Sequence, residues 1–392
     1  MITRSDVDAI SRLAGDGWPI VSLILRVDKE RIDEDYTIRL KNLLRHAADN
    51  LDDRYDHDQT EAALADLARI GAFFRDEGNQ FGQGVAVYAS GRAGIWRLAE
   101  IPREVDSQIH VGLEPFIAPL VRALDRLTPF CTCLVSRNQA RIFYGQMGTF
   151  DELAQIVDSD VPGQHDQGGW SQARYDRHIE EHTRAHFKRV ADELLALFQE
   201  RPFRWLIIGG TSEVVATFVE LLHPYVKDRQ IGTIRTLMEA NVNEVHRESC
   251  AVADRWATDE KQRATEMVRN EALSGDRGVG GVDNTIMALQ QGQILTLVVD
   301  DSLSTPGSVC LNCRSVQPTT DDRPEQCLFC QGPLEHLNDV IPEIVTGVFR
   351  QNASILFLDT PELRNRLLDL GRIGALLRFH VASQSEPRPT SG

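Results

Sequence analysis

The chain has 392 residues, which is long for a single hydrophobic core and predicts two or three domains. Its formal net charge of -16 excludes indiscriminate nucleic-acid binding, because phosphates would be repelled on average, but it allows a local basic surface. No apolar run is long enough to span a bilayer and the first residues contain no apolar signal core, so we expect a cytoplasmic protein with no membrane contact.

Residues 1–126 are predicted to form an N-terminal domain of mixed α/β type. Apolar patterns predict one strand, two helices and a hairpin, in that order, at 18–27, 36–51, 61–77 and 84–101. The segment contains no motif of recognisable chemistry.

Residues 127–245 are predicted to form a middle α/β domain. They open with a hairpin, followed by a polar glycine-containing loop, a long helix, a short buried strand and a second helix. These elements are expected at 130–148, 165–174, 172–199, 204–210 and 213–226. The alternation of strands and helices favours an α/β fold. The Gly209-Gly210 pair after the buried strand fits neither dinucleotide nor P-loop patterns, so we interpret it as a turn.

Residues 246–382 are predicted to form a third domain, also α/β. A long polar helix near 242–273 leads through a glycine-rich turn into a helix and the strand at 294–301. After an inserted cysteine module, a strand, a helix and a strand follow at 353–359, 361–371 and 373–379. The tail at 383–392 is rich in polar residues and proline and is predicted to be disordered.

Four cysteines occur as two matched pairs within a module at 308–335. Cys310, Cys313, Cys327 and Cys330 read C-x2-C-x13-C-x2-C, a spacing that suits tetrahedral thiolate coordination of Zn²⁺. Four thiolates leave no position for water, so the zinc is expected to be structural. A redox-active pair is the alternative, and the polar, proline-containing filler disfavours it. The other three cysteines are interpreted as small buried hydrophobes: Cys131, Cys133 and Cys250.

The loop at 165–174, with the sequence HDQGGWSQAR, is the most unusual stretch of the chain. Gly168 and Gly169 let backbone N–H groups approach a substrate or an RNA backbone closely. The neutral amide of Gln172 can orient a water molecule and donate to a developing oxyanion. Trp170 suits stacking on a base, or anchoring of the loop on its own domain. An ordinary surface loop with Trp170 folded inward is the competing interpretation.

The helix that follows the loop has basic residues at a spacing of four, which predicts that they share one face. These residues are Arg174, His178, His182 and His186, and the sector is widened by Arg177, Arg184, Lys188 and Arg189. A basic sector in an acidic chain is expected of a phosphate-contacting surface. Two alternatives are a histidine metal site, which lacks a fitting carboxylate, and a solvated face partly neutralised by acidic residues.

The order of these elements resembles the middle domain of the archaeo-eukaryotic class-one peptide-chain release factors, their relative Pelota and their bacterial homologues. The elements are a hairpin, the Gly-Gly loop, the basic helix and the buried strand. The stretch at 280–301 is similar to the start of that family's third domain, which is of the ribosomal-protein L7Ae type and carries a small inserted module. The resemblance thus implies a three-domain α/β protein. The family's stop-codon-reading motifs, including Asn-Ile-Lys-Ser, do not occur in the first segment.

The family carries a Gly-Gly-Gln loop into the ribosomal peptidyl-transferase centre. Gly168 and Gly169 match the two glycines, Trp170 occupies the glutamine position, and Gln172 lies two residues further on. The resemblance implies that Gln172 would coordinate the attacking water, and that Trp170 would pack against rRNA or the tRNA end. The implied partners are large-subunit rRNA, peptidyl-tRNA and, as an open option, a translational GTPase that delivers a monomeric factor.

Without decoding motifs, the resemblance favours rescue of stalled ribosomes over ordinary stop-codon termination. Hydrolysis of the peptidyl-tRNA ester would then occur only on the ribosome. The alternative is a non-catalytic hibernation factor that occupies the peptidyl-transferase centre. An independent RNA-processing enzyme is disfavoured, because the sequence contains no convincing set of nucleophile, base and orienting residue.

Overall fold

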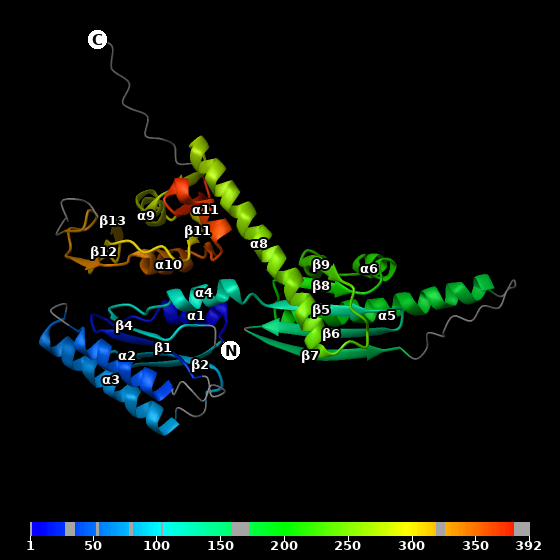
Figure 1. Ribbon diagram of the computed structural model, residues 1–392, viewed down its shortest axis with the longest axis horizontal. Coiled ribbons are helices and arrows are strands. Elements are labelled where there is room, and N and C mark those ends of the chain that lie inside the picture. Colours follow the sequence, from blue (N-terminus) through cyan, green and yellow to red (C-terminus); the bar gives the residue numbers. More distant parts are fainter. Residues whose placement is uncertain are drawn as a thin grey trace, which may run out of the picture. The chain divides into compact units, whose positions relative to one another are not determined.

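A computed structural model describes residues 2–27, 36–51, 55–77, 81–102, 105–146, 148–158, 172–318 and 326–379, with the backbone alone for 77 and 172–178. The chain forms two compact units (Figure 1). Unit 1 consists of Met1–Arg126 with Lys261–Gly392, and unit 2 consists of Leu127–Glu260. The α8 helix (Val242–Ser274) contains the boundary between them.

The N-terminal part of unit 1 is an antiparallel sheet with strand order β3-β2-β1-β4. Its elements are α1 (Arg4–Ser11), β1 (Ile20–Arg26), α2 (Tyr36–Asp49), α3 (His57–Glu77), β2 (Gly84–Ser90), β3 (Ile95–Ile101), β4 (Gln108–Gly112) and α4 (Ala118–Arg126). The central strands β1 and β2 are buried along almost their whole length, which fits their continuous apolar sequence. Alternate residues of β1 pack in one core with residues of α2 and α3.

The C-terminal part of unit 1 contains a sheet of order β10-β16-β11-β15 and a small sheet of order β13-β12-β14. Its helices and strands are β10 (Gly278–Gly280), α9 (Val282–Gln290), β11 (Ile294–Asp300), β12 (Gly307–Cys310), β13 (Val316–Pro318), β14 (Leu334–Leu337), α10 (Ile341–Arg350), β15 (Ser354–Leu358), α11 (Pro361–Asn365) and β16 (Ile373–Leu377). The edge strand β15 pairs in parallel with β11, and the cysteine module lies between these two strands in the chain.

Unit 2 is built on a mixed sheet of order β7-β6-β5-β8-β9. Its elements before α8 are β5 (Phe130–Val135), β6 (Gln139–Gln146), β7 (Thr149–Val157), α5 (Gln172–Glu200), β8 (Trp205–Gly209), α6 (Ser212–Val219), α7 (Pro224–Lys227) and β9 (Gln230–Ile234). The first three strands form an antiparallel meander, while β5, β8 and β9 are parallel, as strand–helix–strand connections require. The apolar side of α5 packs on this sheet through Phe187, Val190 and Leu194.

The mixed α/β class predicted from the sequence is confirmed, as are the hairpin at β5 and β6 and the long helices α5 and α8. The single helix predicted over 213–226 is wrong: α6 ends at Val219, and α7 begins anew at Pro224. Proline has no N–H to continue a helix but is well suited to start one. Strand β7 was not predicted. No helix among the described residues is long and apolar enough to cross a membrane.

Candidate functional site

The loop predicted to carry the chemistry lies mostly outside the described residues, which resume at Gln172. Gly168, Gly169 and Trp170 therefore have no structural description here. Gln172 is the first residue of α5. The same helix carries the backbone of the predicted RNA-binding residues Arg174, Arg177 and His178.

Farther along α5, the basic residues divide between solvent and core. Arg184 and Lys188 are exposed, as predicted for a phosphate-contacting surface, and His182 is half-buried. His186, however, is fully buried, so the predicted single exposed face is wrong at this position. A step of four residues advances about 40° around a helix of 3.6 residues per turn. From Arg174 to His186 these steps add up to about 120°, which turns the last residue toward the sheet.

His186 belongs to a polar cluster that no sequence pattern predicts. Its Nδ1 lies 3.0 Å from Oδ2 of Asp158, the residue directly after β7. The same carboxylate oxygen accepts a hydrogen bond from Nη2 of Arg189. These bonds, that from Arg189 above all, lower the pKa of the Asp158 carboxyl below its ordinary value. The cluster joins the end of β7 to α5, on the two sides of the segment that contains the glycine pair.

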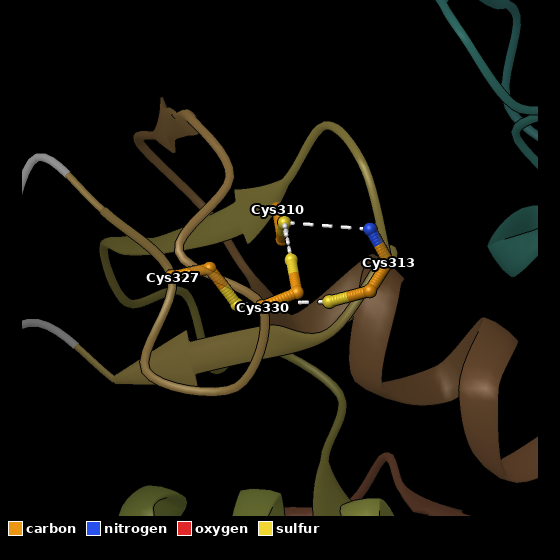
Figure 2. A group of neighbouring side chains, drawn as sticks. All are labelled: Cys310, Cys313, Cys327 and Cys330. Atoms are coloured by element: carbon orange, nitrogen blue, oxygen red, sulfur yellow. Dashed lines mark hydrogen bonds between the residues drawn. The ribbon is translucent and has the colours of Figure 1, made fainter.

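A second candidate site is the cysteine module, where the four predicted ligands come together. The Sγ atoms of Cys310, Cys313, Cys327 and Cys330 all lie within 4.8 Å of one another. Figure 2 shows the four side chains turned toward a common centre. In a tetrahedral zinc site with bonds of about 2.3 Å, the sulfurs are about 3.8 Å apart. The observed Cys310–Cys330 and Cys313–Cys327 separations of 3.4 and 3.6 Å are close to this value.

The two cysteine pairs sit in turns of the same geometry. In each turn, the residue after the second cysteine has a positive φ, 60° at Arg314 and 58° at Gln331. Its backbone N–H donates to the carbonyl of the first cysteine, at 3.0 Å from Arg314 to Cys310 and 2.9 Å from Gln331 to Cys327. The left-handed conformation is unfavourable for residues other than glycine, so its occurrence in both turns indicates that a shared geometry is being held.

Hydrogen-bond donors surround the sulfur atom of Cys327 and favour a thiolate there, whereas contacts with the other cysteine sulfurs raise the pKa of the Cys330 thiol. Nε2 of Gln317 lies 2.9 Å from Sγ of Cys327, and the backbone N–H of Phe329 donates to the same sulfur at 3.4 Å. Burial raises the pKa of the Cys327 thiol, but bonds from the Ser315 hydroxyl and from the N–H groups of Cys330 and Phe329 outweigh burial and lower the pKa to about 6. The donor set and its spacing fit a thiophilic metal ion.

The remaining cysteines have a different environment. Cys131 and Cys133 are buried in the core of unit 2, as predicted, and burial raises the pKa of both thiols. Cys250 is half-buried rather than buried.

Comparison with known proteins identifies the middle of the chain. Residues 115–254 match the model of Bacterial archaeo-eukaryotic release factor family 10. Peptide chain release factor subunit 1 of Methanocaldococcus jannaschii is 24% identical over 311 residues, which cover 72% of this chain and 73% of that protein. Its counterpart from Pyrococcus abyssi is 25% identical over 312 residues, with coverage of 73% and 75%. Over these ranges the chain is similar to archaeo-eukaryotic peptide chain release factors.

Experimental structures similar to this release-factor-like chain include archaeal termination factor aRF1, at 15% identity, coverage of 96% and 99%, and a TM-score of 0.27. Pelota of Archaeoglobus fulgidus has 15% identity, coverage of 76% and 80%, and a TM-score of 0.32. These low TM-scores leave the identification to the sequence matches. The family match includes the glycine pair, α5 and the Asp158–His186–Arg189 cluster, whereas the cysteine module lies outside it.

Proposed function

We propose that this release-factor-like chain is a ribosome-associated translation factor that rescues stalled ribosomes by promoting hydrolysis of peptidyl-tRNA. The observation that carries the proposal is the family match over 115–254, which contains the glycine pair and the helix that follows it. The relatives over most of the chain are named peptide chain release factors. These names favour release of the peptide over mere occupancy of the peptidyl-transferase centre during hibernation.

In this proposal, the backbone at Gly168 and Gly169 approaches the ester bond closely because no side chain intervenes. The Gln172 amide orients the attacking water and donates to the oxyanion that develops at the ester carbonyl. Trp170 stacks on rRNA or on the tRNA end. The exposed Arg184 and Lys188 contact RNA phosphates, together with Arg174, Arg177, His178 and His182. The GTPase partner and the monomeric state follow from the family resemblance alone.

The test is peptide release from stalled ribosomes carrying labelled peptidyl-tRNA. The full chain should release the peptide at a rate well above the spontaneous rate. Gln172→Ala should lower the rate at saturating factor by about 10²-fold, the usual effect of removing one donor to a developing oxyanion. The matched control is Gln199→Ala, which removes an exposed glutamine near the other end of α5 and should leave release unchanged.

Binding to ribosomes is measured in the same samples by co-sedimentation. Tight binding without release would contradict rescue by hydrolysis and favour hibernation. Absence of both binding and release would contradict any role on the ribosome.

We also propose that the cysteine module binds one structural zinc ion. When bound, the zinc crosslinks the two turns through four thiolates and has no open position for a substrate. The third domain that contains the module is proposed to be of the L7Ae type, with domain limits at 126/127 and 245/246.

Metal analysis tests the zinc site directly. Protein purified without chelator should contain about one zinc per chain, as a four-thiolate site predicts. Cys330→Ser should lose most of the metal, whereas Cys250→Ser, which changes a cysteine outside the module, should retain it. Protein that contains no zinc before any substitution would contradict the assignment.

A further inference from the structure

Among the described side chains of α5, fully buried ones occur only in the C-terminal part of the helix. Every described side chain of α5 before His186, from residue 179 to 185, is exposed or half-buried. Burial begins at His186 and Phe187 and continues with Val190 and Leu194. Figure 1 shows α5 continuing past the end of the sheet. We call the part of α5 that precedes His186, residues 172–185, the projecting arm.

Because the arm is long, a small change in its direction displaces the start of α5 considerably. At a rise of 1.5 Å per residue, the start of α5 at Gln172 lies about 21 Å from His186 along the helix axis. A tilt of about 10° at His186 therefore moves the start of the helix by roughly 4 Å. Catalytic groups must be held within about 0.5 Å of their productive positions. A small tilt at His186, the root of the arm, therefore becomes a large displacement at Gln172.

The apolar contacts of α5 do not by themselves fix this direction. Phe187 packs edge-on against Phe218 with ring centroids 5.7 Å apart, and Val190 and Leu194 lie in the same core. Apolar burial is non-directional, so tilt and roll of the helix are opposed there only through the fit of the packed side chains. Hydrogen bonds to a charged acceptor are directional and strong.

The polar cluster provides two such bonds at the root of the arm. Asp158 accepts from His186 and from Arg189, which lie three residues apart on neighbouring positions of α5. The acceptor is held by the sheet, since the backbone N–H of Asp158 donates at 2.8 Å to the carbonyl of Asn138 in the β5–β6 turn. Two bonds from one helix to one fixed carboxylate resist both tilt and roll.

The burial of the cluster also points to a positioning role. His186 is fully buried and Asp158 is 9% exposed, although an apolar residue at position 186 would continue the core more simply. Because the acceptor is a carboxylate, the bond requires a proton on Nδ1 of His186. The ring is thereby fixed in one orientation.

We propose that Asp158, His186 and Arg189 form a positioning clamp that sets the direction of the projecting arm. The clamp concerns the geometry of unit 2 alone, and its consequence for peptide release rests on the function proposed above. The three residues are positioning residues, because they act through the helix and not on the ester.

The direct test measures the arm in the free, full-length protein. Spin labels attached through p-acetylphenylalanine replace Asp176 on the arm and Glu213 on α6, so that the native cysteines are not modified. Pulsed dipolar spectroscopy then gives the distribution of distances between them. Asp158→Asn should widen this distribution about twofold, because the neutral amide is a weaker acceptor. Arg189→Gln should widen the distance distribution less than Asp158→Asn does. Because Arg189 is exposed, this second variant still tests the clamp if Asp158→Asn fails to fold.

The matched control is Glu193→Gln, which changes an exposed charge one turn farther along α5 and should leave the distribution unchanged. A distribution that stays narrow in both clamp variants would overturn the proposal. Equal widening in the control would overturn it as well, since any loss of charge on the helix would then have the same effect.

Peptide release provides the second readout. Asp158→Asn should lower the rate at saturating factor about 10- to 100-fold, since a misplacement of about 1 Å can cost a factor of 10². The half-saturating concentration should change less than about threefold, because the basic surface is retained. A change in half-saturation alone would contradict positioning. If the unmodified protein releases no peptide, the proposed function fails, and the distance distributions still decide the clamp.

Discussion

At the scale of single residues, Glu343 on α10 has a carboxyl with a strongly raised pKa. Burial and the nearby charge of Glu114 raise the pKa of the Glu343 carboxyl to about 7, against the opposing effect of Arg314 and Arg350. Both arginines are engaged by Glu114, at 2.8 Å from Nε of Arg314 and 2.7 Å from Nη1 of Arg350. Among the residues that the structure describes, the arginines nearest Glu343 are thus already paired with another carboxylate.

The raised pKa of Glu343 makes unit 1 less stable as the pH rises. The folded chain binds a proton at this carboxyl up to about pH 7, whereas the unfolded chain releases it near its ordinary pKa of about 4.3. The free energy of unfolding therefore falls as the pH rises from about 4.3 to about 7. Above pH 7 the whole loss of stability is present. The Glu335 carboxylate adds to the cost, because its charge also raises the pKa of Glu343.

Glu343→Gln should remove this cost. We expect the variant to unfold at a higher temperature than the unmodified protein at pH 8, by the equivalent of roughly 1–3 kcal/mol, and to differ little at pH 5. Calorimetric melting at both pH values measures the effect. Glu61→Gln, at an exposed position on α3, should show no such pH-dependent difference. A gain of equal size at pH 5 and pH 8 would show that charge at Glu343 is not the cause.

The residue scale also shows what a sequence can reveal. The cysteine cluster was predictable because its geometry is local: each pair is set by one short turn, and the spacing alone indicates it. The Asp158–His186–Arg189 cluster was not, because its carboxylate directly follows a strand, β7, that was not predicted from the sequence. The burial of His186 could have been anticipated from the 40° drift of a four-residue repeat.

At the scale of secondary-structure elements, the Arg141 side chain on β6 bonds to β7 and to the segment that precedes α8. Its guanidinium makes a two-pronged ion pair from β6 to Glu152 on β7, at 2.8 and 2.7 Å. Nη1 also donates to the backbone carbonyls of Met238 and Ala240, at 2.7 and 2.6 Å. The Arg141 side chain is only 11% exposed, so little water replaces these bonds when they are lost.

Arg141→Leu should destabilise unit 2 by about 2–4 kcal/mol, because it leaves a partly buried carboxylate and two carbonyls without their donor. The free energy of unfolding in urea measures the loss. The matched control is Arg137→Leu, which removes an exposed ion pair with Glu213 at 3.4 Å. Exposed pairs contribute less than about 1 kcal/mol, so the control should be much milder. Similar losses in both variants would contradict a special role for Arg141.

Elements were predictable where their pattern is strong and local. The helices α5 and α8 and the buried strands β1, β2 and β8 follow from long periodic or continuous apolar runs. Strand β7 did not, because its sequence TFDELAQIV contains two acidic residues and its burial pattern is that of a mostly exposed edge strand. Its pairing with β6 comes from tertiary contact, which no local pattern encodes.

At the scale of the whole molecule, the charge balance restricts where RNA can bind. The chain has 58 acidic and 42 Lys and Arg residues, so the average surface repels phosphate. Within α5, the described residues Arg184, Lys188 and Arg189 are exposed. Arg189 is engaged by the clamp, which leaves Arg184 and Lys188 as described candidates for phosphate contacts. If the proposed function holds, ribosome binding should be salt-dependent mainly through this helix.

The salt dependence of binding separates this helix from the rest of the surface. Each phosphate contact adds about 0.7–0.9 to the slope of log affinity against log salt concentration, because a bound counterion is released. The double substitution Arg184→Gln/Lys188→Gln should therefore lower the slope by about 2 and weaken binding at low salt. Arg247→Gln/Arg255→Gln removes the same charge from exposed positions on α8 and should change the slope little. Equal losses in both double variants would mean that the ribosome responds to the total charge of unit 2, and that α5 has no privileged contact with RNA.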